Sequence, residues 1–183
     1  SMRIATWNVL ADCFMLSGEH GSYSYVTPKL MYPGARLQHT QHVIEELRII
    51  GTRIIMLQEV EPHALSVLSQ GWQAFWSIRR RSPAGQLMLI APELNVQQYD
   101  DMSPLSTCRA VIGGIDFVNA HIAWAPADAI GHSGLKQTRA ILAKLDDKRP
   151  AAFLADGNDR PGGPIRALLQ EAGFDNVVGS QPT

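Results

Sequence analysis

Apolar runs of strand length recur along the whole chain, and turn-forming residues separate them. The strongest runs lie at residues 2–10, 53–60, 115–122 and 151–156, and all four are dominated by apolar side chains. Runs of this length and composition are typical of strands that are buried on both faces. Shorter runs predict four further strands, at residues 72–78, 86–90, 94–99 and 108–112.

Segments with helical periodicity lie between these strands. In residues 36–50 the apolar side chains of Leu37, Ile44 and Leu47 fall on one side of a helix, and Gly51 ends the pattern. Three further helices are predicted at residues 63–70, 133–145 and 164–172. Strands and helices of this kind predict a mixed domain in which helices cover the outside of a strand core.

The composition limits the class of protein. The 183 residues are 45% hydrophobic, with no linker or repeat, and this predicts a single domain over residues 2–183. The formal net charge of −1 gives no overall positive field for binding a long nucleic-acid duplex. A protein that acts only on the end of a nucleic-acid strand does not need such a field. Two cysteines are too few for a disulfide framework, and no apolar run is long enough to span a bilayer. We therefore expect a cytoplasmic or nuclear protein without a membrane partner.

Polar side chains stand at the carboxyl ends of the strongest strands. The second predicted strand ends at Glu59, and the fourth ends at Asp156. Each such residue has an ordinary explanation, such as a turn, a helix cap or an ion pair. All of them together are better explained by one polar cluster at the rim of the strand core. The members of that predicted cluster are Asn8, Glu59, His121, Asp156 and Asn158.

The residue types in this cluster indicate phosphate chemistry. Carboxylates with carboxamides beside them offer hard oxygen ligands, which suit Mg²⁺ or Mn²⁺ better than zinc. A divalent cation with a nearby histidine and amide donors can polarise a phosphoryl group and neutralise its charge. The sequence has no glycine-rich phosphate-binding loop, so hydrolysis of a phosphate ester is favoured over nucleotide-dependent transfer. The consecutive arginines at residues 79–81 fit either a solvated hairpin tip or a phosphate contact.

The motifs around these residues resemble the endonuclease/exonuclease/phosphatase superfamily, the Mg²⁺-dependent fold of deoxyribonuclease I and the inositol polyphosphate 5-phosphatases. The matching segments, in chain order, are residues 6–12 (TWNVLAD), 57–60 (LQEV), 119–122 (NAHI) and 154–158 (LADGN). The chain is most similar to the branch of deadenylases, nocturnin, Angel and 2'-phosphodiesterases. The features shared with that branch are Tyr23, Tyr25, Pro28, Arg36, Trp124, Pro126 and Gln137.

The resemblance implies a role for each matching residue. Glu59 would bind Mg²⁺ or Mn²⁺ with Asn8 beside it, and His121 would contact the scissile phosphate. Asp156 would orient or deprotonate the attacking water, and Asn158 would hold the phosphate or the aspartate. The substrate would be an RNA 3' end or a nucleotide. Three further residues would bind it: Arg36, Asn119 and Trp124.

The fold implied by the resemblance is an α+β two-layer β-sandwich flanked by helices. The superfamily pattern ends in a strand followed by an Asp-His pair, whereas this sequence ends at Gln181-Pro182-Thr183. We therefore expect a C-terminally truncated sandwich that lacks one or two strands. A partner chain or a further C-terminal segment would complete the sheet.

Two alternatives to an active hydrolase remain open at this point. The first is a phosphate- or RNA-binding module that hydrolyses little, because losing a general base typically costs roughly two to four orders of magnitude in rate. The second is a fragment of a longer or split enzyme.

Overall fold

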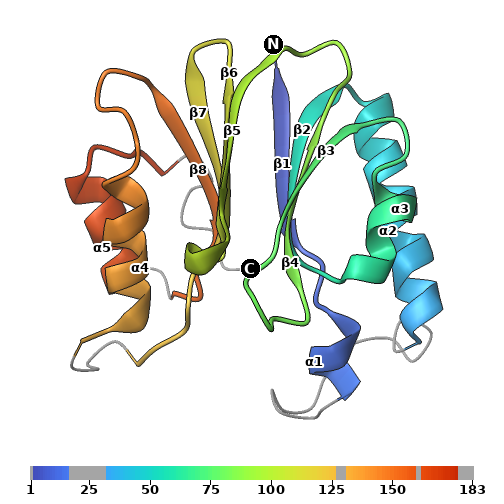
Figure 1. The fold of residues 1–183 in the computed structure, drawn as a ribbon, viewed down its shortest axis with the longest axis horizontal. Coiled ribbons are helices and arrows are strands. Elements are labelled where there is room, and N and C mark those ends of the chain that lie inside the picture. Colours follow the sequence, from blue (N-terminus) through green and yellow to red (C-terminus); the bar gives the residue numbers. More distant parts are fainter. Residues whose placement is uncertain (1, 17–31, 127–130, 160–161, 177–183) are drawn as a thin grey trace.

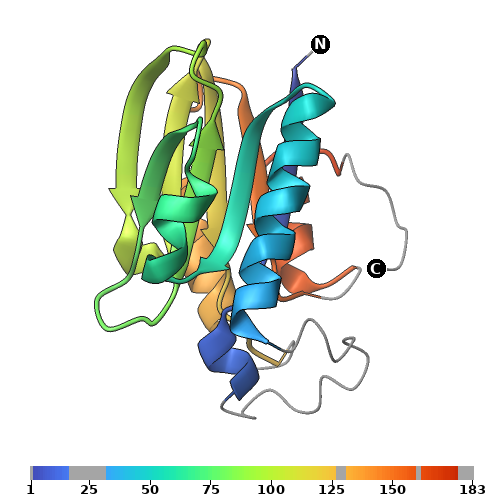
Figure 2. The same cartoon turned by 90° about the vertical axis from the view of Figure 1, so that its right-hand side faces the viewer.

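Two four-stranded sheets pack face to face, and helices cover the outer side of each (Figures 1 and 2). The computed structural model describes residues 2–16, 32–126, 131–159 and 162–176. The predicted α+β sandwich is confirmed. Residues 23, 25 and 28 of the sequence motif lie outside the described residues.

The first sheet is built from the amino-terminal half of the chain. Its strand order is β1-β2-β4-β3, with β1 parallel to β2 and the remaining pairs antiparallel. Helices α2 and α3 lie on its outer face (Figure 1). The elements are β1 (Arg3–Asn8), α1 (Asp12–Leu16), α2 (Pro33–Ile49), β2 (Thr52–Val60), η2 (Pro62–Ala64), α3 (Leu65–Leu68), β3 (Gln73–Ser77) and β4 (Gly85–Ile90).

The second sheet is built from the carboxyl-terminal half. Its strand order is β5-β6-β7-β8, with β7 parallel to β8 and the remaining pairs antiparallel. Helices α4 and α5 cover its outer face (Figure 1). The elements are β5 (Val96–Met102), η3 (Ser103–Leu105), β6 (Thr107–Ile112), β7 (Ile115–His121), α4 (Ser133–Leu142), β8 (Ala151–Asp156) and α5 (Pro164–Glu171).

Strand β2 is buried on both faces, which explains why its sequence is a continuous apolar run. Ile54 and Met56 pack between the sheets, against Phe117 of β7 and its neighbours. Ile55 and Leu57 alternate with them and pack beneath α2 and α3. Because successive side chains in a strand point to opposite faces, a strand covered on both sides needs apolar residues at every position.

The outer edges of β1 and β8 are less covered than the strands inside each sheet. Every residue of β4 and β6 is buried, whereas every residue of β8 is only partly buried. On β1, Ile4 is 37% exposed. Among the described residues, no strand pairs with the outer edge of β1 or β8. That a partner chain or C-terminal segment completes these edges stays a prediction.

Most predicted elements are found within a few residues of their expected ends. The largest difference concerns residues 63–70, where the structure has the short 3₁₀ turn η2 followed by the four-residue helix α3. The helix expected at 133–145 ends at Leu142, and the strand expected at 94–99 runs from Val96 to Met102. Within the described ranges, no helix has the length and apolar character needed to cross a membrane.

Candidate active site

The carboxyl ends of four strands, two from each sheet, converge at one end of the sandwich. They bring together Asn8 of β1, Glu59 of β2, His121 of β7 and Asp156 of β8. The Asn8 amide nitrogen donates to Glu59 Oε1 at 2.8 Å and to Asp156 Oδ2 at 2.7 Å. One side chain therefore joins carboxylates that belong to different sheets and stand 97 positions apart by number in the chain.

His121 faces these two carboxylates from the second sheet. Its Nε2 atom lies 3.6 Å from Glu59 Oε1 and 4.0 Å from Asp156 Oδ2. The same nitrogen lies 3.1 Å from the amide nitrogen of Asn158, which also donates to the Ile122 carbonyl at 2.8 Å. Asn158 is placed by its own backbone N–H, which donates to Asp156 Oδ1 at 3.0 Å. The five residues predicted to form a cluster do lie together.

The backbone around the cluster adopts conformations that are unfavourable for most residues. Leu10, Glu59 and Asn158 have φ values of 58°, 57° and 44°, in the left-handed region. At Glu59 this coincides with an irregularity in the pairing of β2 with β4, between Leu57 and Val60. Such conformations cost on the order of 1 to 3 kcal/mol each and concentrate at functional sites. The strained backbone at Leu10, Glu59 and Asn158 therefore indicates a functional site at this end of the sandwich.

The donor atoms fit a hard divalent cation. Glu59, His121 and Asp156 each offer one ligand atom, and these atoms lie within 4.8 Å of one another. Two carboxylates held this close repel each other unless a positive charge compensates them. Oxygen-rich sets of this kind suit Mg²⁺ or Mn²⁺. The residues present therefore fit the cation that the sequence motifs imply.

The arrangement of Asn8 differs from the one predicted for a metal ligand. Its Oδ1 accepts from the Leu10 N–H at 2.9 Å, and its Nδ2 faces the two carboxylates. An amide nitrogen that donates hydrogen bonds cannot also ligate a cation. In this arrangement Asn8 orients Glu59 and Asp156, and the oxygen ligands for a cation would come from those carboxylates.

Asn119 lies beneath the cluster, fully buried between the two sheets. Its Nδ2 donates to the carbonyls of Leu57 and Leu87, at 3.0 and 3.1 Å, and its Oδ1 accepts from Gln58 Nε2 at 2.7 Å. Gln58 donates in turn to Thr6 Oγ1 at 3.1 Å. The predicted contact between Asn119 and substrate is not supported by this position. The amide instead links the second sheet to the strands that carry Asn8 and Glu59.

Replacing Asn119 by leucine is expected to lower the free energy of unfolding by about 2 kcal/mol, because buried polar partners lose their hydrogen bonds. Urea denaturation measures this change. Gln98 is an exposed residue of β5, and Gln98→Leu is the matched control, with little expected change in the free energy of unfolding. If Asn119→Leu keeps the stability of the parent protein but binds substrate more weakly, Asn119 does not link the sheets and contacts substrate instead.

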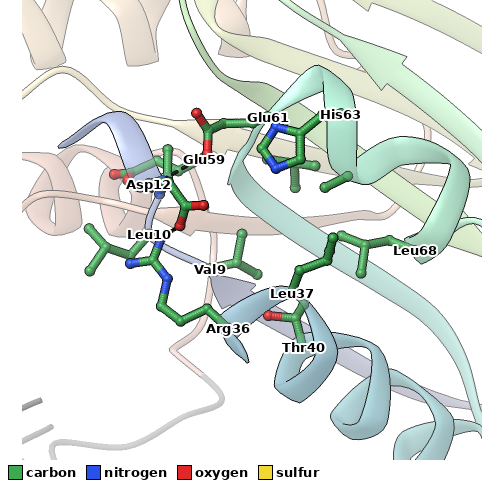
Figure 3. A pocket seen from close by; sticks show the side chains of 13 residues that line it. Val9, Leu10, Asp12, Arg36, Leu37, Thr40, Glu59, Glu61, His63 and Leu68 are labelled. Carbon is green, nitrogen blue, oxygen red and sulfur yellow. Dashed lines mark hydrogen bonds and ion pairs between the residues drawn. The ribbon is translucent and has the colours of Figure 1, made fainter. Parts of the chain in front are cut away.

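Arg36 lies at the start of α2 and points toward Asp12 of α1 (Figure 3). The two form an ion pair in which both side chains are largely buried. Burial lowers the pKa of Arg36, and the charges of Glu61 and Glu59 partly oppose that effect. In the structure Arg36 therefore fastens α1 to α2, and its predicted contact with substrate stays a prediction.

A small cavity of about 40 Å³ is lined by Arg36 and by the end of β2. Asp12, Glu61 and His63 form a second group with cation-ligating atoms beside it (Figure 3). The Glu61 carboxylate accepts from the Asp12 backbone N–H at 2.8 Å, and Asp12 is paired with Arg36. These contacts give both carboxylates a structural role in holding α1. The sequence patterns did not single out this group, because its members are distributed over two short elements.

Trp124 follows His121 by three residues and is 69% exposed. Its predicted contact with substrate stays a prediction. Gln58 was not predicted to take part in the hydrogen-bond network beneath the cluster. A polar residue in a buried strand, directly before Glu59, was a signal that could have identified it.

The fold matches solved structures of phosphatases. No known family model matches the sequence, and no curated protein matches it significantly. The structure of ANGEL2, a 2',3'-cyclic phosphatase, superposes with a TM-score of 0.67 at 14% sequence identity, covering 98% of this chain and 62% of that chain. Another ANGEL2 structure, in complex with adenosine-2',3'-vanadate, gives a TM-score of 0.64 at 15% identity, covering 98% of this chain and 63% of that one.

Two bacterial structures match equally well. One is an endonuclease/exonuclease/phosphatase from Bacteroides vulgatus, with a TM-score of 0.67 at 14% identity, covering 93% of this chain and 70% of that chain. The other is the mannosyl-6-phosphatase Bt3783 of Bacteroides thetaiotaomicron, with a TM-score of 0.66 at 11% identity, covering 94% and 71%. This chain thus has the endonuclease/exonuclease/phosphatase fold, as predicted. It spans less than two thirds of the length of the ANGEL2 structures.

Proposed function

We propose that this chain is a divalent-metal-dependent phosphoesterase that acts on the 3' end of RNA or on a nucleotide. The observation that carries the proposal is the convergence of Asn8, Glu59, His121, Asp156 and Asn158 at one end of the sandwich. The phosphatases with the same fold support phosphoester hydrolysis as the reaction class.

Each residue of the cluster has a part that follows from its contacts. Glu59 and Asp156 would hold the cation, which would supply charge to polarise the phosphoryl group. Asp156 also offers a carboxylate that can orient a water molecule for attack and accept its proton. His121 and Asn158 would donate to a phosphate oxygen that replaces the 3.1 Å contact between their side-chain nitrogens. Asn8 fixes the two carboxylates at their working separation.

The choice of an RNA end or nucleotide rests on two supports. ANGEL2, which shares the fold, is described as a 2',3'-cyclic phosphatase and has been captured with adenosine-2',3'-vanadate. In this chain Trp124 follows His121 by three residues, and its ring is exposed and free to stack on a base. The arginines at 79–81 lie in the β3–β4 hairpin, at the same end of the sandwich as Glu59, and could meet further phosphates.

A substrate panel tests the proposed class. A short oligoadenylate RNA, its DNA counterpart, adenosine 2',3'-cyclic phosphate and mannose 6-phosphate are compared with Mg²⁺ present. The proposal predicts turnover of the RNA or the cyclic nucleotide and little turnover of the sugar phosphate. Turnover of the sugar phosphate alone would replace the substrate class while keeping the chemistry, and binding without turnover would favour a binding module.

A further inference from the structure

The backbone that follows β7 is held at every polar group from the His121 N–H to the Ala123 N–H. The His121 N–H donates to the Ser106 carbonyl at 3.0 Å, and the Ile122 N–H donates to the Asp156 carbonyl at 2.9 Å. The Ile122 carbonyl accepts from Asn158, as described above. The remaining two groups, on His121 and Ala123, bond to a single side chain that comes from α4.

That side chain is Gln137. Its Nε2 donates to the His121 carbonyl at 2.8 Å and to the Leu105 carbonyl at 2.6 Å, and its Oε1 accepts from the Ala123 N–H at 2.7 Å. Both N–H donors of the amide are used, and its oxygen faces an N–H. The hydrogen bonds therefore fix the orientation of the amide, because a flipped group would face like partners.

Helix α4 is itself packed tightly against this segment. At Gly134, an added Cβ would lie 2.6 Å from the Ala123 carbonyl oxygen and 2.7 Å from Ile165 Cδ1. One turn along, Thr138 is fully buried and donates to the Gly134 carbonyl at 2.8 Å. The amide of Gln137 is therefore carried by a tightly packed part of α4. Such support is needed to hold a neighbouring group in a defined position.

We propose that Gln137 is a positioning residue that fixes His121 relative to Glu59 and Asp156. Its function in catalysis rests on the proposed phosphoesterase activity, whereas its effect on His121 geometry does not. The reacting groups must be held close to their productive arrangement, and a displacement of about 1 Å can reduce a rate on the order of 100-fold. Losing the amide leaves the His121 carbonyl and the Ala123 N–H without these hydrogen bonds.

The test compares Gln137→Met, which removes all three bonds at similar size, with Gln137→Glu, which keeps the acceptor for Ala123 but loses both donors. Lys136→Met is the control on the same helix, since it changes the exposed neighbour of Gln137 and leaves the three hydrogen bonds of the Gln137 amide in place. We expect both Gln137 variants to lower kcat on the order of 100-fold with KM nearly unchanged, and the control to keep kcat. In a His121→Ala background, Gln137→Met should add no further loss.

A second readout is independent of turnover. In protein labelled with ¹⁵N-histidine, the imidazole signals of His121 are assigned by their loss in His121→Ala. Gln137→Met should shift or broaden them, and Lys136→Met should not. If these signals and kcat are both unchanged in Gln137→Met, the positioning role is wrong. Absent turnover in the parent protein, with His121 signals still perturbed, would refute the phosphoesterase proposal and leave the positioning role standing.

Discussion

Asp156→Asn is expected to lower kcat by roughly two to four orders of magnitude, the usual loss when a general base is removed. The substitution keeps the size of the side chain and an oxygen that can accept from the Asn158 N–H. It removes the negative charge that would attract the cation and take the proton of the attacking water. Steady-state kinetics at saturating substrate measure the change.

Asp159→Asn is the matched control for this variant. Asp159 lies three residues further along, and its carboxylate accepts from the backbone N–H groups of Ile165 and Arg166 at the start of α5. It is outside the cluster, so kcat should remain close to that of the parent protein. If Asp156→Asn retains full kcat, or if Asp159→Asn loses as much, Asp156 is not the base.

Glu59→Gln is expected to weaken binding of Mn²⁺ by at least about 100-fold. Changing a residue that only supports a metal ligand typically costs 10- to 100-fold in affinity, so losing a ligand charge should cost no less. The glutamine is isosteric and can still bond to Asn8 or to the Ala11 N–H, which Glu59 contacts at 2.8 and 3.1 Å. Isothermal titration calorimetry with Mn²⁺ measures the affinity.

Glu61→Gln separates this site from the second group of carboxylates. Glu61 is two residues away, belongs to the same stretch of chain and contacts Asp12 instead of the cluster. The account predicts nearly unchanged Mn²⁺ affinity for this control. A loss in Glu61→Gln with none in Glu59→Gln would place the cation at the group formed by Asp12, Glu61 and His63.

The strand ends of the site could be predicted from sequence because their signal is local. A polar residue at the end of an apolar strand can be recognised from the sequence around it, and parallel strands bring their carboxyl ends to one edge of the sheet. The alternation of side chains along a strand places Asn119 and His121, two residues apart, on one face. Alternation does not tell how deep on that face each residue lies, and the substrate contact that the resemblance implied for Asn119 is not supported by its place in the interior.

Other features depend on contacts between distant segments and left no local signal. Arg36 is paired with Asp12 across two helices, and its predicted contact with substrate came only from the family resemblance. Gln137 stood out in sequence only as part of a motif, because its bonds reach Leu105 on one side and His121 on the other. The predicted helix at 63–70 is interrupted because a 3₁₀ turn begins at Pro62, just after Glu61.

The measurement that tests the central claim most directly is hydrolysis of a 3'-oligoadenylate RNA with Mg²⁺, with Mn²⁺ and with EDTA. It is made on the parent protein and on Asp156→Asn in parallel. The account predicts mononucleotide release that needs the cation and is lost in the variant. Equal release with EDTA, or equal release by both proteins, would contradict a metal-dependent site at the ends of β1, β2, β7 and β8.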